Sequence, residues 1–206
     1  MGNLIHTQIN VALPVSLPKV SIDSLTDRIL SKPFGLPSWV QEDQGFKKAR
    51  PSRFYSIAVR LKESRATREK RIEQMINQLS LTCQKAGLNA EITGRPKHIF
   101  SIYKKMQNKG LHLKEVLDLN GIRMILMDTA TCYDALDMVH RLWAPVPELF
   151  DDYIKHPKPS GYQSLHTTVH PFNGSCLEVQ IRTKIMHREA ESGRAAHWRY
   201  KKWENA

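Results

Sequence analysis

The sequence has few cysteines, no long apolar run and a shortage of acidic residues, and each shortage excludes a class of protein. Three cysteines, at positions 83, 132 and 176, are too few and too scattered for a disulfide framework or a zinc knuckle. No apolar stretch approaches the roughly 20 residues of a membrane span, and the first residues lack the basic flank and apolar core of a secretory signal. We therefore expect no membrane partner and a reducing compartment, either a bacterial cytoplasm or a plastid stroma.

The shortage of acidic residues points to an anionic partner. The 206 residues contain 31 lysines and arginines against 20 aspartates and glutamates, which gives a net charge of +11. Such a balance favours nucleotide phosphates, nucleic acid or an acidic surface as the partner. Basic residues concentrate between residues 47 and 71, and apolar residues at helical spacing run through much of that region. A helix with a solvated basic face explains that concentration equally well.

The positions of proline and glycine, which interrupt regular structure, divide the chain into two parts. These are an irregular lead-in, residues 1–52, and one folded domain, residues 53–206. The lead-in carries prolines spread among small and polar residues, whereas the domain alternates helical and strand patterns. Helices are predicted at 53–86, 97–109, 130–143 and 184–203, and strands at 89–93, 121–127, 165–169 and 176–183. Such an order indicates an α/β or α+β domain around a mixed sheet.

The strand 176–183 is predicted to have one apolar and one polar face. Leu177, Val179 and Ile181 share one face, and Glu178, Gln180 and Arg182 share the other. The neighbouring strand brings Ser164, His166 and Thr168 to the same sheet. The polar side chains then converge beside a basic loop, although a simply solvated face is the ordinary interpretation of such a strand.

Two further features lie near this face. The entrance "TGRPKH" of the helix 97–109 places Arg95 and Lys97 beside helix N-terminal amides, with Pro96 in the first turn, which suits a phosphate. Asp118 precedes an apolar strand, and together with Glu178 it could supply the carboxylates of a Mg²⁺ site. Alternatively, the helix is merely solvated, Asp118 caps a turn and Glu178 lies on the surface.

Several stretches resemble the synthetase domain of the RelA/SpoT homologue family. They are "GRPKHIFSIYKKM", "DLNGIRMIL", "FDDYIKHPKPSGYQSLHTTV", "LEVQIRT" and "AAHWRYK", and the resemblance covers about residues 53–202. The resemblance implies an α+β fold similar to nucleotidyltransferases, a mixed sheet flanked by helices. It also implies transfer of pyrophosphate from ATP to the 3′-hydroxyl of GDP or GTP, which makes the alarmones ppGpp and pppGpp.

The resemblance also implies roles for individual residues. Asp118 and Glu178 would bind Mg²⁺, and Glu178 would help to activate the attacking hydroxyl. Tyr162 would stack on the guanine of the acceptor. The ATP-binding residues would be Arg95, Lys97 and Ser101, and the residues that bind GDP or GTP would be Lys158, Tyr162, His166 and Gln180.

Departures from the family pattern bear on the activity expected. Ser160 stands where many members have asparagine, so one acceptor contact is expected to be weaker. Asp151 is closer to the acidic version of synthesis-only members. No His-Asp dipeptide of the family's hydrolase domain occurs in the sequence. We therefore expect synthesis without hydrolysis.

Two other functions stay open at this stage. One is a toxin-like pyrophosphokinase that acts on the 3′ end of tRNA, with the basic helix holding the RNA backbone. The other is a domain that binds nucleotide or RNA without turnover. The sequence also leaves open whether the chain forms homo-oligomers, and whether regulatory domains are missing because it is a fragment of a longer protein.

Overall fold

The computed structural model describes residues 37–171 and 176–193. The helices are α2 (Ser38–Ala49), α3 (Pro51–Arg60), α4 (Arg65–Lys85), α5 (Ile99–Lys109), α6 (Thr129–Leu142) and α7 (Lys184–Ser192), with short 3-10 turns at Leu113–Glu115 and Pro147–Leu149. The strands are β1 (Glu91–Pro96), β2 (Asn120–Leu126), β3 (Ala144–Pro145), β4 (Asp151–Asp152), β5 (Leu165–His170) and β6 (Leu177–Thr183). In this part of the chain no helix is both long and apolar enough to cross a membrane.

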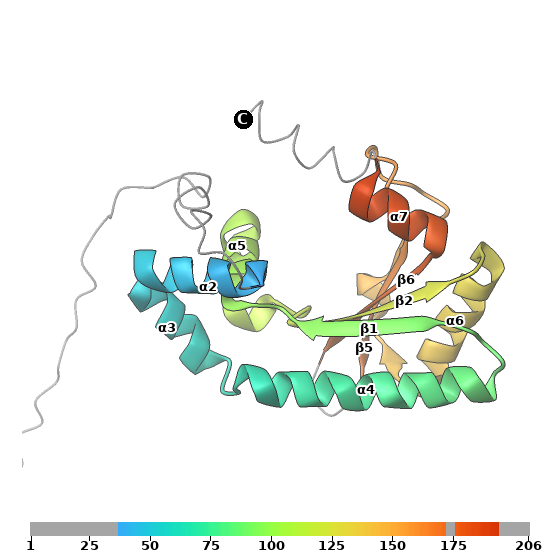
Figure 1. Cartoon of the computed structure of the whole chain (residues 1–206), viewed down its shortest axis with the longest axis horizontal. Coiled ribbons are helices and arrows are strands. Elements are labelled where there is room, and N and C mark those ends of the chain that lie inside the picture. The colour runs from blue at the N-terminus through green and yellow to red at the C-terminus, as the bar shows by residue number, and fades with distance from the viewer. Residues whose placement is uncertain (1–36, 172–175, 194–206) are drawn as a thin grey trace, which may run out of the picture.

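The strands form one mixed sheet in the order β1-β2-β6-β5-β3, with β4 also paired to β5. Strands β2 and β6 run parallel, and the other pairs are antiparallel. In Figure 1, α4 runs along one side of this sheet and α7 lies on the other. The predicted α+β fold with a mixed sheet and flanking helices is confirmed.

The main core lies between the sheet and the helices α4 and α6. Met75 and Leu79 of α4 and Val139 of α6 are fully buried against Met124 of β2 and Ile181 of β6. Because side chains alternate along a strand, the residues between these apolar ones face the other side of the sheet. The sheet therefore presents a polar face away from α4, as the pattern of residues 176–183 predicts.

The predicted helix 53–86 is two helices, α3 and α4, with a corner between them. Lys62 has a left-handed backbone with φ of 55°, which no continuous helix contains. Ser64 then caps α4 by accepting a hydrogen bond from the Thr67 amide at 3.0 Å. The apolar stripe continues through the corner, so its spacing gives no sign of the break.

Part of the predicted irregular lead-in is the helix α2. Its Phe46 is fully buried, with ring centroids 4.6 Å from Tyr103 and 5.3 Å from Phe100 of α5. The prolines that suggested irregular structure do not interrupt this helix, since Pro37 lies at its N-cap and Pro51 begins the next one. Residues 1–36 of the lead-in lie outside the described residues.

Two other predicted boundaries change. The strand predicted at 89–93 runs from Glu91 to Pro96, so Pro96 ends β1 and His98, not Pro96, marks the start of α5. Helix α7 is described as far as Ser192, and the rest of the helix predicted to residue 203 lies outside the described residues. Gly110 ends α5 in a left-handed conformation, as predicted.

Candidate active site

Asp118 lies at the centre of a cluster of charges between α5 and the start of β2. Its carboxylate accepts hydrogen bonds from the ammonium groups of both Lys97 and Lys105, and Lys97 Nζ also donates to the Asp118 carbonyl at 3.0 Å. Burial raises the pKa of Asp118, but the bonds from the two lysines outweigh it and hold that pKa below its usual value. Asp118 is therefore an ionised carboxylate, although only 9% of the residue is exposed.

The amides at the start of α5 are already bound by a carboxylate of the protein itself. Asp43 of α2 accepts hydrogen bonds from the backbone amides of Phe100 at 2.8 Å and Ile99 at 3.2 Å. The neighbouring Glu42 lies 2.7 Å from the ring of His98. The prediction that these amides are free to hold a phosphate is thus wrong for this structure, because a side chain more than fifty residues earlier in the sequence takes the site.

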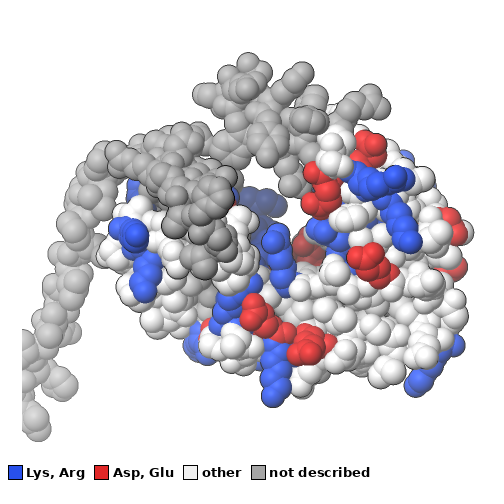
Figure 2. Space-filling view, viewed as in Figure 1, with Lys and Arg blue, Asp and Glu red and all other residues white. Residues whose placement is uncertain are grey.

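A cleft of about 370 Å³ lies on the polar face of the sheet. Figure 2 shows lysine and arginine side chains gathered around a hollow on this side of the molecule, with acidic side chains beside them. The residues that line the cleft include Arg95, Lys97, Arg123, Glu178, Gln180 and Glu191. The structure thus brings four of the predicted residues to one place, and adds Arg123 and Glu191.

Arg123 is detectable in the sequence once the strand is known. It alternates with Ile122 and Met124 of β2 and pairs in register with Gln180 of β6, so it lies on the polar face. Its guanidinium is 3.3 Å from the Glu191 carboxylate of α7. Glu191 could not be placed in this way, because α7 reaches the cleft only in the folded chain.

Ser101 is not among the residues that line the cleft. Its hydroxyl lies 3.1 Å from the ring nitrogens of His98 on the first turn of α5. Of the three residues expected to bind ATP, Arg95 and Lys97 therefore line the cleft and Ser101 does not.

Glu178 extends the charged cluster along β6. Its carboxylate lies 3.5 Å from His166 Nδ1, and it accepts a hydrogen bond from the Gln180 amide at 3.2 Å. Burial raises the pKa of Glu178, and nearby Asp118 raises it further. The bond with His166 and the charge of Lys97 outweigh both, so that the pKa is lowered. Glu178 is consequently a second ionised carboxylate within electrostatic reach of Asp118.

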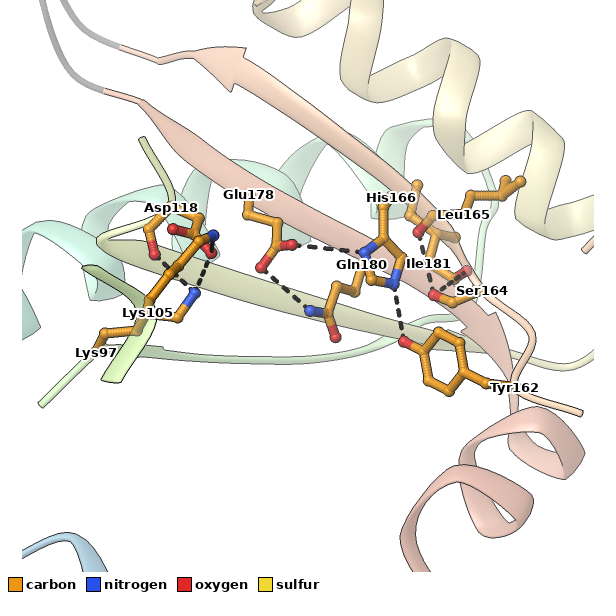
Figure 3. Close-up of polar contacts among 10 residues, drawn as sticks. All are labelled: Lys97, Lys105, Asp118, Tyr162, Ser164, Leu165, His166, Glu178, Gln180 and Ile181. Carbon is orange, nitrogen blue, oxygen red and sulfur yellow. Dashed lines mark hydrogen bonds and ion pairs between the residues drawn. The ribbon is translucent and has the colours of Figure 1, made fainter. Parts of the chain in front are cut away.

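The loop before β5 presents Tyr162 to the same face. Gly161 adopts a left-handed backbone with φ of 79°, and its amide donates to the Lys158 carbonyl at 2.7 Å. The Tyr162 hydroxyl is 2.8 Å from His166 Nε2, so His166 joins Tyr162 to Glu178 in the series of contacts shown in Figure 3. Tyr153, which the sequence reasoning missed, packs edge-on against His166 with centroids 5.3 Å apart.

Lys158 lies over the rings of this loop. Its ammonium is 4.1 Å from the Tyr153 centroid and 5.5 Å from the Tyr162 centroid, and the residue is exposed. Cation–π contacts of this kind keep a positive charge beside the aromatic surface while leaving it open to solvent. An aromatic face with an adjacent cation suits a base that carries phosphates.

The carboxylate pair could hold a divalent cation together with oxygens from a ligand. Among residues 37–171 and 176–193, no group of three or more His, Cys, Asp or Glu side chains could hold a metal ion. Mg²⁺, however, is commonly bound by one or two carboxylates with substrate phosphates and water. Asp118 Oδ1 is buried and has no hydrogen-bond partner, since both lysines bind Oδ2. The donor set therefore fits such an ion.

Comparisons with known proteins agree with this geometry. The family described as "Region found in RelA / SpoT proteins" matches residues 94–205. Proteins named GTP pyrophosphokinase from Photobacterium angustum and Escherichia coli are each 44% identical over 167 residues, which cover 81% of this chain and 22% of the relative. The chain thus spans about a fifth of their length.

A solved structure shows the same fold. The small alarmone synthetase 1 from Bacillus subtilis, bound to its product pppGpp, superposes with a TM-score of 0.57 at 22% sequence identity. The match covers 65% of this chain and 77% of that one.

Proposed function

The chain belongs to the RelA/SpoT family, and from this membership we propose that it is a (p)ppGpp synthetase, which transfers pyrophosphate from ATP to the 3′-hydroxyl of GDP or GTP. We place the synthetase domain at residues 53–206, with α2 packed against it. The observation that carries the proposal is the convergence, in one cleft, of the ionised Glu178 with the cations Arg95, Lys97 and Arg123. The names of the relatives add support.

The donor half of the cleft is the cationic end. Arg95, Lys97 and Arg123 line it, and the phosphates of ATP would replace water around their charged groups. Transfer of a pyrophosphoryl group depends mainly on in-line positioning and on cations that neutralise the phosphate oxygens as charge shifts. Arg123 supplies such a cation from β2, and Arg95 and Lys97 supply two more from the end of β1 and the residue just after it.

The acceptor would bind at the aromatic side chains next to the cleft, which His166 connects to Glu178. Tyr162 would stack on guanine, with Lys158 near the acceptor's phosphates and with His166 and Gln180 holding the site from β5 and β6. The 3′-hydroxyl of the acceptor would then approach Glu178. The oxygen of this hydroxyl attacks the β-phosphorus of ATP, the bond from that phosphorus to the α,β-bridging oxygen breaks, and AMP leaves.

Glu178 would receive the proton of the attacking hydroxyl. Its lowered pKa keeps it ionised at neutral pH, so it is ready to accept a hydrogen bond and then a proton. Asp118 and Glu178 would together hold Mg²⁺, which when bound neutralises phosphate oxygens and makes the hydroxyl more acidic. In this proposal Lys97 and Lys105 balance the charge of Asp118 and keep its carboxylate in place.

We assign synthesis without hydrolysis to this region, supported by the acidic Asp151 and by the absence of a His-Asp dipeptide in the sequence. Incubating the protein with ppGpp and Mn²⁺ should leave the 3′-pyrophosphate intact. Release of pyrophosphate would contradict this part of the proposal.

The synthetase itself is tested by incubation with ATP, Mg²⁺ and either GDP or GTP, followed by separation of the nucleotides. We expect AMP and ppGpp or pppGpp in equal amounts. Nucleotide binding without any product would support a non-catalytic domain instead. Product on the 3′ end of added tRNA, but none on guanine nucleotides, would identify a tRNA pyrophosphokinase.

A further inference from the structure

A second cavity, of about 640 Å³, lies beside the corner between α3 and α4. Basic residues of α3, α4 and the turn Leu113–Glu115 line it, together with Glu63 and several leucines. Among the described residues, none lines both this cavity and the cleft on the polar face of the sheet. A volume of this size is typical of a site for a small molecule.

The wall of the cavity carries an excess of positive charge. Arg60, Arg68, Arg71 and Lys114 face a single acidic residue, Glu63. The Glu63 carboxylate is already bound to the Arg71 guanidinium at 2.6 Å. The remaining cations have no acidic counterpart in the wall, so the cavity is suited to an anion.

Arg68 is the unusual member of this set, because it is buried and forms no close ion pair. Only 5% of the residue is exposed, and within residues 37–171 and 176–193 the carboxylates of Asp43, Glu63 and Glu69 act on it from beyond ion-pair distance. Its Nη1 donates to the Lys97 carbonyl at 3.0 Å, while its Nε has no hydrogen-bond partner. A buried guanidinium is costly unless close anions and hydrogen bonds compensate it, so an anionic ligand that accepts from Nε would be stabilised here.

The apolar part of the wall limits the kind of anion. Leu61, Leu113 and Leu117 line the cavity beside the basic groups, and Leu117 is 40% exposed although it is a large apolar side chain. A bare inorganic anion would leave this surface in contact with water. A ligand with a ring next to its phosphates would cover it.

We propose that this cavity binds a multiply phosphorylated small molecule of nucleotide size. Its phosphates would lie against Arg60, Arg68, Arg71 and Lys114, and its ring would lie against the leucines. Arginine is well suited to this role because its planar fork can bind two phosphate oxygens at once.

The two sites are connected through the backbone of Lys97. Arg68 binds the Lys97 carbonyl, and the Lys97 amide donates to the Leu119 carbonyl at 2.8 Å. Leu119 lines the cavity, and the Lys97 side chain binds Asp118 in the charged cluster. Substitution of Arg68 would therefore disturb both sites, so the test uses the exposed cations Arg60 and Lys114.

The test is calorimetric titration of inorganic tripolyphosphate into three proteins at low ionic strength. The parent is expected to show two classes of site. The double variant Arg60→Glu with Lys114→Glu should lose one class, with affinity weaker by about tenfold or more. The control Lys70→Glu with Lys85→Glu has the same net charge, changes exposed lysines outside the cavity, and should keep both classes. Equal binding by the two double variants would overturn the proposal.

A second experiment tests whether the ligand of the cavity carries a ring, in a variant whose cleft no longer binds phosphates. In the variant Arg95→Gln with Arg123→Gln, binding should be confined to the cavity, and a nucleoside triphosphate should bind several times more tightly than tripolyphosphate. Equal affinities would overturn the assignment of a ring. Because this arm measures binding alone, it fails or succeeds independently of (p)ppGpp synthesis.

Discussion

The proposed active site has two halves, which are held together by different forces. In the proposed donor half, charge dominates, because Lys97 and Lys105 bind the buried Asp118 carboxylate. In the proposed acceptor half, ring contacts dominate, with His166 placed edge-on to Tyr162 at a centroid distance of 5.7 Å. The comparison teaches that phosphate binding and base binding should be separable by substitution, whereas Glu178, which lies between the halves, should affect both.

The largest effect is expected for Glu178→Gln, which removes the group shared by the two halves. Synthesis should fall by about 10²-fold or more, since a general base alone contributes about 10² to 10⁴. The free energy of unfolding should change by no more than about 0.5 kcal/mol, because the amide keeps the size and polarity of the side chain. Initial rates and denaturant unfolding measure the two quantities.

The matched control is Glu73→Gln, an exposed glutamate of α4 that lies outside the cleft. It should keep both the parental rate and the parental stability. If the Glu178 variant behaves like this control, Glu178 has no part in the reaction.

The next largest effect is a change in the KM for one substrate without a change in the KM for the other. Tyr162→Ala should raise the KM for GDP or GTP by about tenfold and leave the KM for ATP unchanged, since stacking on a base is worth about 1–3 kcal/mol. Tyr162→Phe keeps the ring and should stay close to the parent. Arg95→Gln is expected to show the opposite pattern, with the KM for ATP raised. Parallel changes in both KM values for either variant would contradict the division into donor and acceptor halves.

The sequence predicts which side chains share the polar face of the sheet better than it predicts the contacts of α5, for a physical reason. The positions of His166, Glu178 and Gln180 follow from alternation along strands, which is a local property of the chain. Asp43 reaches the start of α5 across more than fifty residues, so no local pattern reveals it. The corner at Lys62 is likewise hidden, because the apolar stripe runs through it.

A smaller effect is expected where α2 supports the donor half. Asp43→Ala removes the carboxylate that accepts hydrogen bonds from two amides of α5, and it should lower the free energy of unfolding by about 1 kcal/mol, as for the loss of a helix cap. The exposed Asp134→Ala on α6 serves as the control. Thermal unfolding measures the difference, and equal melting temperatures for the two variants would remove Asp43 from the support of α5.

The smallest expected effect is a loss of folding stability at low pH. The pKa values of Asp118 and Glu178 are lowered from 3.8 and 4.5 in the folded protein, so the folded state binds fewer protons than the unfolded state. The stability that the two carboxylates contribute is fully present above their pKa values in the unfolded state. It is lost as the pH falls through their lowered pKa values in the folded state. Unfolding followed between about pH 3 and pH 7 should show this loss, and Asp118→Asn should flatten it. An equally steep loss in the variant would assign the acid sensitivity to other groups.

The central claim is that a pyrophosphoryl group, and not a single phosphoryl group, passes to the acceptor in this cleft. The most direct measurement uses ATP labelled at the β-phosphate, with Mg²⁺ and GDP or GTP. The account predicts that the label appears on the acceptor and that unlabelled AMP forms in equal amount, with both products suppressed by Glu178→Gln. Label that remains in ADP, or that stays in ATP while the nucleotides bind, would contradict the account.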